Sequence, residues 1–216
     1  MIIGIVGFAG SGKGTVGDIL IRDHNFTRIS FADSVKDAVS NIFGWDRHLL
    51  EGDTVESRDF RECRDQWWSE RLGYNMTPRL AMQLMGTEAG RDVFHKDIWI
   101  LSVANKLRKR THENIVIPDV RFANEMEFIR SSGGFIVRVL RGNDPLWYNT
   151  AVEANKTGNT DLMSQHNVHY SEWAWIGQQF NYVIPNNGTI AMLEADVRHL
   201  IRVFTGPTDS DTMKSV

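Results

Sequence analysis

Short apolar runs alternate with segments of helical periodicity along most of the chain. Five apolar runs rich in β-branched residues predict strands over Ile2–Val6, Thr27–Ala32, Asn114–Ile117, Gly134–Leu140 and Phe180–Ile184. Apolar residues three and four positions apart predict helices over Gly14–Arg22, Ser34–Phe43, Asp97–Arg110, Glu125–Ser131 and Ile190–Phe204. Strands that alternate with helices form βαβ units with right-handed crossovers, so we expect an α/β fold of three layers, α/β/α, around a mostly parallel sheet of about five strands.

Capping residues mark the start of two helices. Asp33 or Ser34 is the expected N-cap of the helix that follows the second strand. Thr77-Pro78 opens a further helix, with a capping threonine and a proline in the first turn.

Three segments interrupt the alternation of strands and helices. Trp45–Arg71 is rich in charge and tryptophan, and we interpret it as an inserted, mostly helical flap. Gly142–Gln165 is polar and lacks clear periodicity, which indicates a mobile loop. We expect a disordered tail at the end of the chain. The resulting organisation is one domain over residues 1–205, an insertion at 45–95, a lid-like loop at 142–168 and a tail at 206–216.

Composition and charge exclude several classes of protein. Hydrophobic residues make up 42% and charged residues 24% of the 216 residues, close to globular averages, so the chain is not wholly disordered. The net charge of −3 argues against nucleic acid as a partner, because that requires concentrated basic charge. No apolar run approaches the roughly 20 residues that span a bilayer, and the start lacks a basic leader. The single Cys63 favours a cytoplasmic location.

The most specific motif is Gly7-Phe8-Ala9-Gly10-Ser11-Gly12-Lys13-Gly14-Thr15, between the first predicted strand and the first predicted helix. It fits the pattern of a phosphate loop: glycine, four residues, then glycine and lysine. Its glycines let the backbone curl so that N–H groups surround a phosphate beside a helix N-terminus. Lys13 is expected to bridge the β- and γ-phosphates. The residues predicted to bind ATP here are Gly10, Ser11, Gly12, Lys13, Gly14 and Thr15.

The residue after the lysine bears on metal binding. Gly14 stands where GTPases have serine or threonine, so the hydroxyl moves to Thr15. This Gly-Lys-Gly-Thr form resembles adenylate kinase and its nucleoside monophosphate kinase relatives. We therefore expect Mg²⁺ to be held through phosphates and water, with Thr15 as the candidate protein ligand. His166 and His169 lack a third ligand at a recognisable spacing, so we predict no metal site there.

Two groups of polar residues in the first half of the chain are candidates for binding a second substrate. Asp33 and Lys36 follow the second predicted strand, where ligands of parallel sheets collect, although a helix cap and a solvated charge explain them as well. Arg79 and Gln83 share a helix face, and Arg91 follows. Arginine suits a monophosphate and glutamine a base edge, whereas an ordinary polar face is the alternative.

Two further groups follow later strands. Asp119 ends an apolar strand, where a carboxylate serves as a base or faces a metal in this class of fold, and Arg121 lies two residues on. Arg138 and Arg141 stand at the end of the next strand, before the polar loop. They are candidates to meet the γ-phosphate, and a pair of solvated charges is the alternative.

Several segments occur in a characteristic order: the phosphate loop, Ala32–Lys36, Arg79–Thr87, Asp97–Trp99, Pro118–Arg121 with Asn124-Glu125, and His169–Glu172. Together they resemble the bacteriophage deoxynucleoside monophosphate kinases, an offshoot of the P-loop nucleoside monophosphate kinases. The resemblance implies a P-loop kinase fold. It also implies Mg²⁺-dependent transfer of the γ-phosphoryl group of ATP to a 2′-deoxynucleoside 5′-monophosphate, in the host cytoplasm if the protein is viral.

The resemblance further implies roles for single residues. The insertion at 45–95 becomes the acceptor-binding region, with Trp99 against the base or sugar. Lys13, Asp119 and Arg121 become the catalytic residues. Lys156 is the only lysine or arginine in 142–172, so the arginines that stabilise the transition state are expected among Arg121, Arg138 and Arg141, the last two also contacting ATP. The residues implied for the acceptor are Asp33, Lys36, Arg79, Gln83, Arg91, Trp99, Asp119, Arg121 and Glu125.

Two other functions stay open at this point. One is a different small-molecule P-loop kinase, such as one acting on dephospho-coenzyme A, whose sequence has a similar strand–Asp–helix opening. The other is a nucleotide-binding switch that signals to a protein partner without turnover. A homodimer is compatible with each of these.

Overall fold

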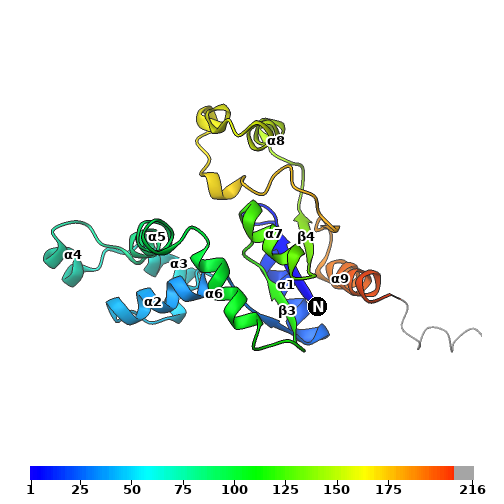
Figure 1. The fold of residues 1–216 in the computed structure, drawn as a ribbon, viewed down its shortest axis with the longest axis horizontal. Coiled ribbons are helices and arrows are strands. Elements are labelled where there is room, and N and C mark those ends of the chain that lie inside the picture. The colour runs from blue at the N-terminus through cyan, green and yellow to red at the C-terminus, as the bar shows by residue number, and fades with distance from the viewer. Residues whose placement is uncertain (207–216) are drawn as a thin grey trace, which may run out of the picture. The chain divides into compact units, whose positions relative to one another are not determined.

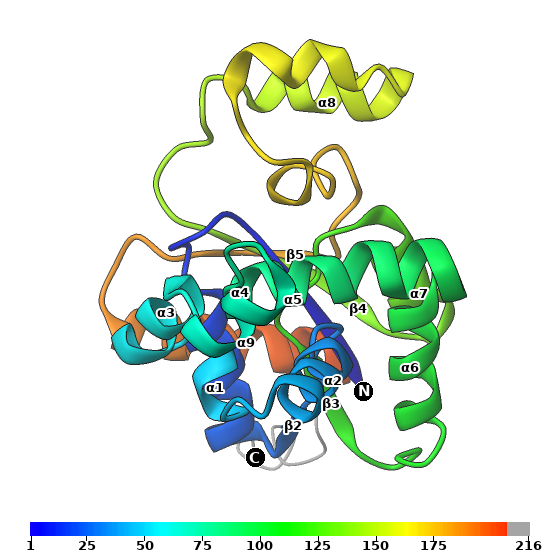
Figure 2. The same ribbon diagram turned by 90° about the vertical axis from the view of Figure 1, so that its left-hand side faces the viewer.

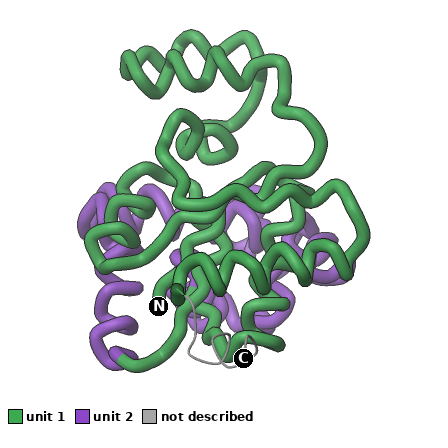
Figure 3. Tube along the Cα trace, turned by 90° about the vertical axis from the view of Figure 1, so that its right-hand side faces the viewer, with its two compact units in different colours: residues 1–29, 112–216 green, residues 30–111 purple. Residues whose placement is uncertain are grey.

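A computed structural model describes residues 1–206, so the predicted tail at 206–216 lies outside the described residues apart from Gly206. The described residues form two compact units (Figure 3): unit 1 comprises residues 1–29 and 112–206, and unit 2 comprises Ser30–Thr111. No helix among residues 1–206 is long and apolar enough to cross a membrane. The elements are β1 (Ile2–Val6), α1 (Lys13–His24), β2 (Phe26–Arg28), α2 (Asp33–Phe43), η1 (His48–Leu50), α3 (Val55–Glu62), α4 (Gln66–Leu72), α5 (Pro78–Leu84), η2 (Met85–Phe94), α6 (Ile98–Leu107), β3 (Asn114–Ile117), α7 (Ala123–Ser131), β4 (Phe135–Leu140), α8 (Tyr148–Thr157), η3 (Thr160–His166), η4 (Tyr170–Glu172), β5 (Tyr182–Pro185) and α9 (Ile190–Thr205).

Unit 1 is built on a parallel five-stranded sheet in the order β2-β3-β1-β4-β5. Helices α1 and α9 cover one face, where Ile5, Leu20 and Val197 belong to one buried cluster. Helix α7 covers the other face, and Gly4 lets Ile129 approach the central strand because any side chain there would clash with it. Figure 1 shows α7 and α9 on either side of β4. The predicted three-layer α/β/α fold with a parallel sheet is confirmed.

The predicted strand over residues 27–32 is shorter in the structure, because the chain turns at Ser30. The backbone N–H of Ser30 donates to Asp33 Oδ2 at 2.9 Å, and Ala32 N–H donates to Ser30 Oγ at 3.1 Å. Helix α2 therefore has Ala32 as its N-cap, with no capping side chain. The prediction of Asp33 or Ser34 as N-cap is wrong, since the Asp33 carboxylate holds this turn instead.

Unit 2 is helical, as predicted for the flap at Trp45–Arg71, which contains η1, α3 and most of α4. The predicted cap of the next helix is confirmed, because Thr77 Oγ1 accepts from Leu80 N–H at 3.1 Å. The core of this unit includes Val39, Leu50 and Met76. The insertion predicted at 45–95 falls within unit 2, and its description as part of a single domain stays a prediction.

Asp65 joins the start of α4 to the core of unit 2, and its removal is expected to lower the free energy of unfolding. Its Oδ1 accepts from Trp68 N–H at 2.9 Å, and its Oδ2 accepts from the indole of buried Trp45 at 2.7 Å. Asp65→Ala removes a helix cap and leaves the indole N–H unpaired, a combined loss of about 2 kcal/mol. Urea denaturation followed by circular dichroism measures it. Exposed Asp59→Ala is the control, and an equal loss in both variants would refute this role.

The segment Gly142–Gln165 is not the predicted mobile loop. It contains α8 and most of η3, and α8 stands apart from the sheet in Figure 2. The buried residues of α8 are Ala151 and Ala154, and Asn155 Nδ2 donates to the carbonyls of Trp173 and Ile176 at 2.9 Å each. A helix whose buried residues are two alanines shows no apolar stripe, so its sequence has no periodic signal. A lid role for 142–168 stays a prediction.

Candidate active site

The phosphate loop follows the C-terminal end of β1 and leads into α1. Gly10 and Gly12 have φ values of 76° and 100°, in the left-handed region that favours glycine. Gly12 is the N-cap of α1 and has no side chain to accept from the first-turn N–H groups. The first turn of α1 also contains no acidic residue. This helix end is therefore suited to an anion bound by backbone N–H groups.

Two side chains of the loop point to the same conclusion. The Lys13 ammonium donates to the carbonyl oxygens of Gly7 and Phe8 at 2.6 and 2.8 Å. Ser11 is only 4% exposed, and its side-chain hydroxyl has no hydrogen-bond partner. Burial and, to a smaller extent, the positive charge of Arg121 lower the pKa of Lys13 to about 8, and the negative charge of Glu172 partly opposes them. The loop thus combines an unpaired hydroxyl with a cation held by neutral carbonyls.

Two asparagines that sequence reasoning missed follow β5, and the first of them supports the phosphate loop. Asn186, just after β5, donates from Nδ2 to the Ser11 carbonyl at 2.8 Å and lies against Gly12. Asn187 Oδ1 accepts from Gly142 N–H at 2.7 Å. The signal was a polar pair at the end of a strand, which is where ligand-binding residues collect in a parallel sheet.

Asp119 and Arg121 follow β3, as predicted. Arg121 Nη1 donates to Glu172 Oε1 at 2.6 Å and to Ser171 Oγ at 3.2 Å. Glu125 is buried, and its Oε2 accepts from the backbone N–H groups of Arg121 and Phe122 at 2.8 and 3.1 Å. Glu125 therefore holds the turn that presents Arg121. Asp119 is half-buried and takes part in interactions of its own. Lys13, Arg121 and Glu172 form one electrostatic group in unit 1.

The two arginines predicted at the end of β4 have different surroundings. The Arg138 side chain is 9% exposed, forms an ion pair with Asp144 and donates to Tyr148 Oη at 3.2 Å. Its guanidinium lies 5.0 Å from the Tyr148 ring centroid and 5.3 Å from that of Trp175. Arg141 is exposed. Arg138 lies within β4, whereas Arg141 follows the last residue of that strand. Their predicted contact with ATP stays a prediction.

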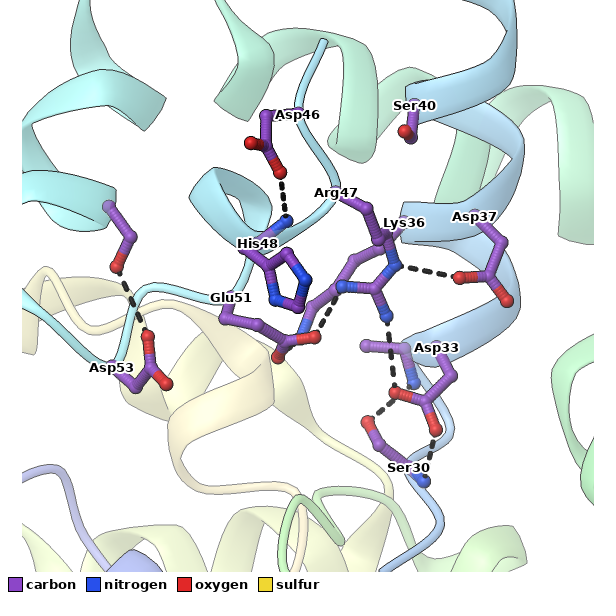
Figure 4. A network of polar contacts seen from close by, with 12 residues as sticks. Ser30, Asp33, Lys36, Asp37, Ser40, Asp46, Arg47, His48, Glu51 and Asp53 are labelled. Atoms are coloured by element: carbon purple, nitrogen blue, oxygen red, sulfur yellow. Dashed lines mark hydrogen bonds and ion pairs between the residues drawn. The ribbon is translucent and has the colours of Figure 1, made fainter.

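In unit 2, Asp33 and Lys36 belong to a network of charges (Figure 4). Arg47, which sequence reasoning missed, is at its centre: Nε donates to Asp37 at 2.7 Å, Nη2 lies 3.5 Å from Asp33, and Nη1 donates to Glu51. Lys36 donates to the other oxygen of Glu51 at 2.6 Å. Burial raises the pKa of Glu51, but the hydrogen bonds from Lys36 and Arg47 outweigh it and lower the pKa to about 2.

The remaining predicted acceptor residues also lie in unit 2. Arg79 and Gln83 stand one turn apart on α5, and Arg79 donates to Glu62. Arg91 is part of η2, a stretch of π-helix, which is common at functional sites. The Trp99 indole donates to the Gly86 carbonyl at 2.8 Å and packs against Gly90, so it joins α6 to η2. Because the indole N–H is already donated, the predicted contact of Trp99 with a nucleotide would use the face of the ring.

Comparison with known proteins gives the family. The family model described as deoxynucleotide monophosphate kinase matches residues 47–197. A protein of Acanthamoeba polyphaga mimivirus assigned as a deoxynucleotide monophosphate kinase is 33% identical over 153 residues, covering 65% of this chain and 74% of that protein. The deoxynucleoside-5′-monophosphate kinase of Escherichia phage T5 is 29% identical over 181 residues, covering 61% and 72%. Among solved structures, shikimate kinase from Aquifex aeolicus matches with a TM-score of 0.43 and 15% identity, covering 95% and 97%.

The family match spans most of the chain and includes the residues singled out after β3 and on α5. The phosphate loop precedes the matched range, and it is identified by its sequence motif and its backbone geometry. The chain therefore belongs to the deoxynucleotide monophosphate kinase family.

Proposed function

We propose that this protein transfers the γ-phosphoryl group of ATP to the 5′-phosphate of a 2′-deoxynucleoside monophosphate, giving ADP and a deoxynucleoside diphosphate. One observation carries the proposal: in a chain of this family, the phosphate loop has an unpaired buried Ser11 hydroxyl and a Lys13 ammonium that rests on loop carbonyls. Both groups gain better partners from a phosphate. We also propose a cytoplasmic location, in line with the free thiol of Cys63.

On the donor side, the N–H groups at the start of α1 and the Lys13 ammonium hold the triphosphate. The ammonium exchanges the carbonyls of Gly7 and Phe8 for phosphate oxygens, because a hydrogen bond between two charged groups is stronger. Lys13 then follows the negative charge as it moves from the γ- to the β-phosphate. Asn186 keeps the loop curled through the Ser11 carbonyl.

In the transfer step, an oxygen of the acceptor phosphate forms a bond to the γ-phosphorus. The bond from that phosphorus to the β,γ-bridging oxygen breaks, and its electron pair stays on ADP. The attacking oxygen is already anionic, so Asp119 positions groups rather than acting as a strong base. Arg121 neutralises charge that develops on the equatorial oxygens.

For the acceptor we assign residues of unit 2. Arg79 binds the monophosphate, Gln83 the base edge and the Trp99 ring the base or sugar, and Arg91 adds positive charge. The spacing of Arg79 and Gln83 on α5 supports a shared face toward one ligand. We also assign Asp33 and Lys36 to the binding of the acceptor. Arg47 pairs with Asp33 and holds it in place.

The residues of unit 1 fit Mg²⁺. This ion prefers oxygen ligands and is usually held by one or two protein oxygens together with substrate phosphates and water. The Thr15 hydroxyl in the first turn of α1 and the Asp119 carboxylate after β3 would be such ligands. The hydroxyl of Ser11 in the phosphate loop is buried without a partner. When bound, Mg²⁺ supplies charge neutralisation on the phosphates of ATP.

The lowered pKa of Lys13 predicts the pH dependence of the reaction. The protonated ammonium is the form that binds phosphate, so kcat/KM for ATP should fall as the pH rises through about 8. Bound ATP favours the charged form, so kcat should fall only at higher pH. Initial rates between about pH 6 and about pH 10 test this. A value of kcat/KM that stays constant through about pH 9 would refute the assignment of Lys13.

The proposal is tested by ADP release with ATP, Mg²⁺ and each common deoxynucleotide, ribonucleotide and dephospho-coenzyme A as acceptor. We expect release that depends on a deoxynucleoside monophosphate. Faster release with dephospho-coenzyme A than with any deoxynucleotide would overturn the acceptor. ATP binding without acceptor-dependent release would indicate a switch instead.

A further inference from the structure

Arg121, the arginine assigned to the transition state, already holds an anion in this structure. Its guanidinium contacts Glu172 at 2.6 Å and the Ser171 hydroxyl at 3.2 Å. Ser171 and Glu172 belong to η4, some fifty positions further along the chain. The side chains of Arg121 and Glu172 are 51% and 36% exposed, so solvent and ligands reach this ion pair.

Aromatic side chains on either side of η4 in the sequence also pack against the phosphate loop. The Phe8 ring of the phosphate loop contacts the rings of Trp147 and Trp175, with centroid distances of 5.5 and 5.0 Å. Arg138 lies buried beside Trp175, and Trp175 itself is 2% exposed. The aromatic contacts therefore keep this region in place when the Arg121–Glu172 ion pair opens.

We propose that Glu172 is a positioning residue that occupies Arg121 in the absence of nucleotide and gives it up to the terminal phosphates of ATP. The inference rests on the proposed function, since it concerns the same phosphate site. Glu172 acts through Arg121 and does not take part in the transfer itself.

Charge and exposure explain why the exchange proceeds. Exposed ion pairs contribute little to stability, so Arg121 loses little by leaving Glu172. The triphosphate carries several negative charges and offers the guanidinium paired oxygens, which it binds more strongly than one carboxylate oxygen. Glu172 also lies close enough to affect the pKa of Lys13, so its negative charge opposes an incoming phosphate until it moves away.

The test measures binding by calorimetry to the full-length protein. Glu172→Gln keeps the size of the side chain and removes the competing charge, so ATP should bind about fivefold more tightly. ADP should gain less, and adenosine, which has no phosphate, should not change. The control is Glu194→Gln, because Glu194 pairs with Arg22 at 2.7 Å and with similar exposure on another part of unit 1. This control should leave all three affinities unchanged.

A double-mutant cycle separates competition from a general effect of charge. In an Arg121→Gln background, Glu172→Gln should tighten ATP binding by less than about twofold. Glu172→Asp, whose shorter side chain reaches Arg121 less well, should tighten ATP binding by an intermediate factor. This variant replaces Glu172→Gln in the test if the glutamine variant does not fold. Unchanged or weaker ATP binding in both Glu172 variants would overturn the proposal.

Two outcomes distinguish the role of Glu172 from the proposed kinase activity. If the wild type phosphorylates a deoxynucleotide and the Glu172 variants bind ATP no better, the function holds and the competition is refuted. If the variants bind ATP more tightly and the wild type phosphorylates no deoxynucleotide, the competition holds and the acceptor is refuted.

Discussion

Replacing Lys13 with alanine is expected to reduce kcat/KM for phosphoryl transfer by at least about a hundredfold, or about 2.7 kcal/mol of transition-state stabilisation. The loss has a direct cause, since Lys13 is the cation of the phosphate loop and follows the charge to the leaving group. Its ammonium already donates to the carbonyls of Gly7 and Phe8 in the phosphate loop. Initial rates at saturating and limiting ATP measure the effect.

The matched control for Lys13 is Lys109→Ala, an exposed lysine of unit 2 that should leave the rate within about twofold. Circular dichroism of both variants checks that the fold is kept. Unchanged transfer in Lys13→Ala would place the donor phosphates elsewhere, whatever the loop motif indicates.

Arg121→Gln is expected to lower kcat by about a hundredfold, with a smaller effect on KM for ATP. Arg121 is held by the Glu125 turn and shifts the pKa of Lys13 through its charge, so it lies where charge develops during transfer. Glutamine keeps hydrogen bonds but loses the charge. Arg121→Lys should recover part of kcat, because it restores the charge without the planar guanidinium.

The control for Arg121 is Arg198→Gln on the exposed surface of α9, which should change neither parameter. A loss in Arg121→Gln confined to KM would assign Arg121 to ground-state binding of ATP. It would also leave Arg141 and Arg138 as the arginines to test for the transition state.

The elements that could be predicted from the sequence are those whose pattern is local. Strands β1 and β3 have the predicted bounds, because each is a continuous apolar run closed by glycine or proline. The start of α5 was predicted because Thr77 and Pro78 act within one turn. The phosphate loop belongs to the same group, since its glycines, its lysine and the flanking elements are contiguous.

What the sequence did not reveal depends on contacts between distant residues. Asn186 supports the phosphate loop from 175 positions away, and Glu172 meets Arg121 across 51 positions. Neither pairing leaves a local pattern. Arg47 was passed over among alternating charges, although it binds three carboxylates. Such pairings follow from the fold and not from spacing.

The residues predicted to bind the acceptor illustrate a different limit. A charged residue on a helix is explained equally well by a ligand, an ion pair or solvent. In this structure Arg79 pairs with Glu62, Lys36 pairs with Glu51, and the Trp99 indole donates to Gly86. These contacts are compatible with exchange for a substrate, so the assignments of these residues stay predictions until variants are measured.

The measurement that tests the central claim most directly follows the phosphoryl group itself. ATP radiolabelled in the γ-phosphate is incubated with the protein, Mg²⁺ and one deoxynucleoside monophosphate at a time, and the products are separated by chromatography. Our account predicts that the label appears in the deoxynucleoside diphosphate, at a rate that depends on Lys13. Label that appears only as inorganic phosphate, or that stays in ATP with every deoxynucleotide, would contradict it.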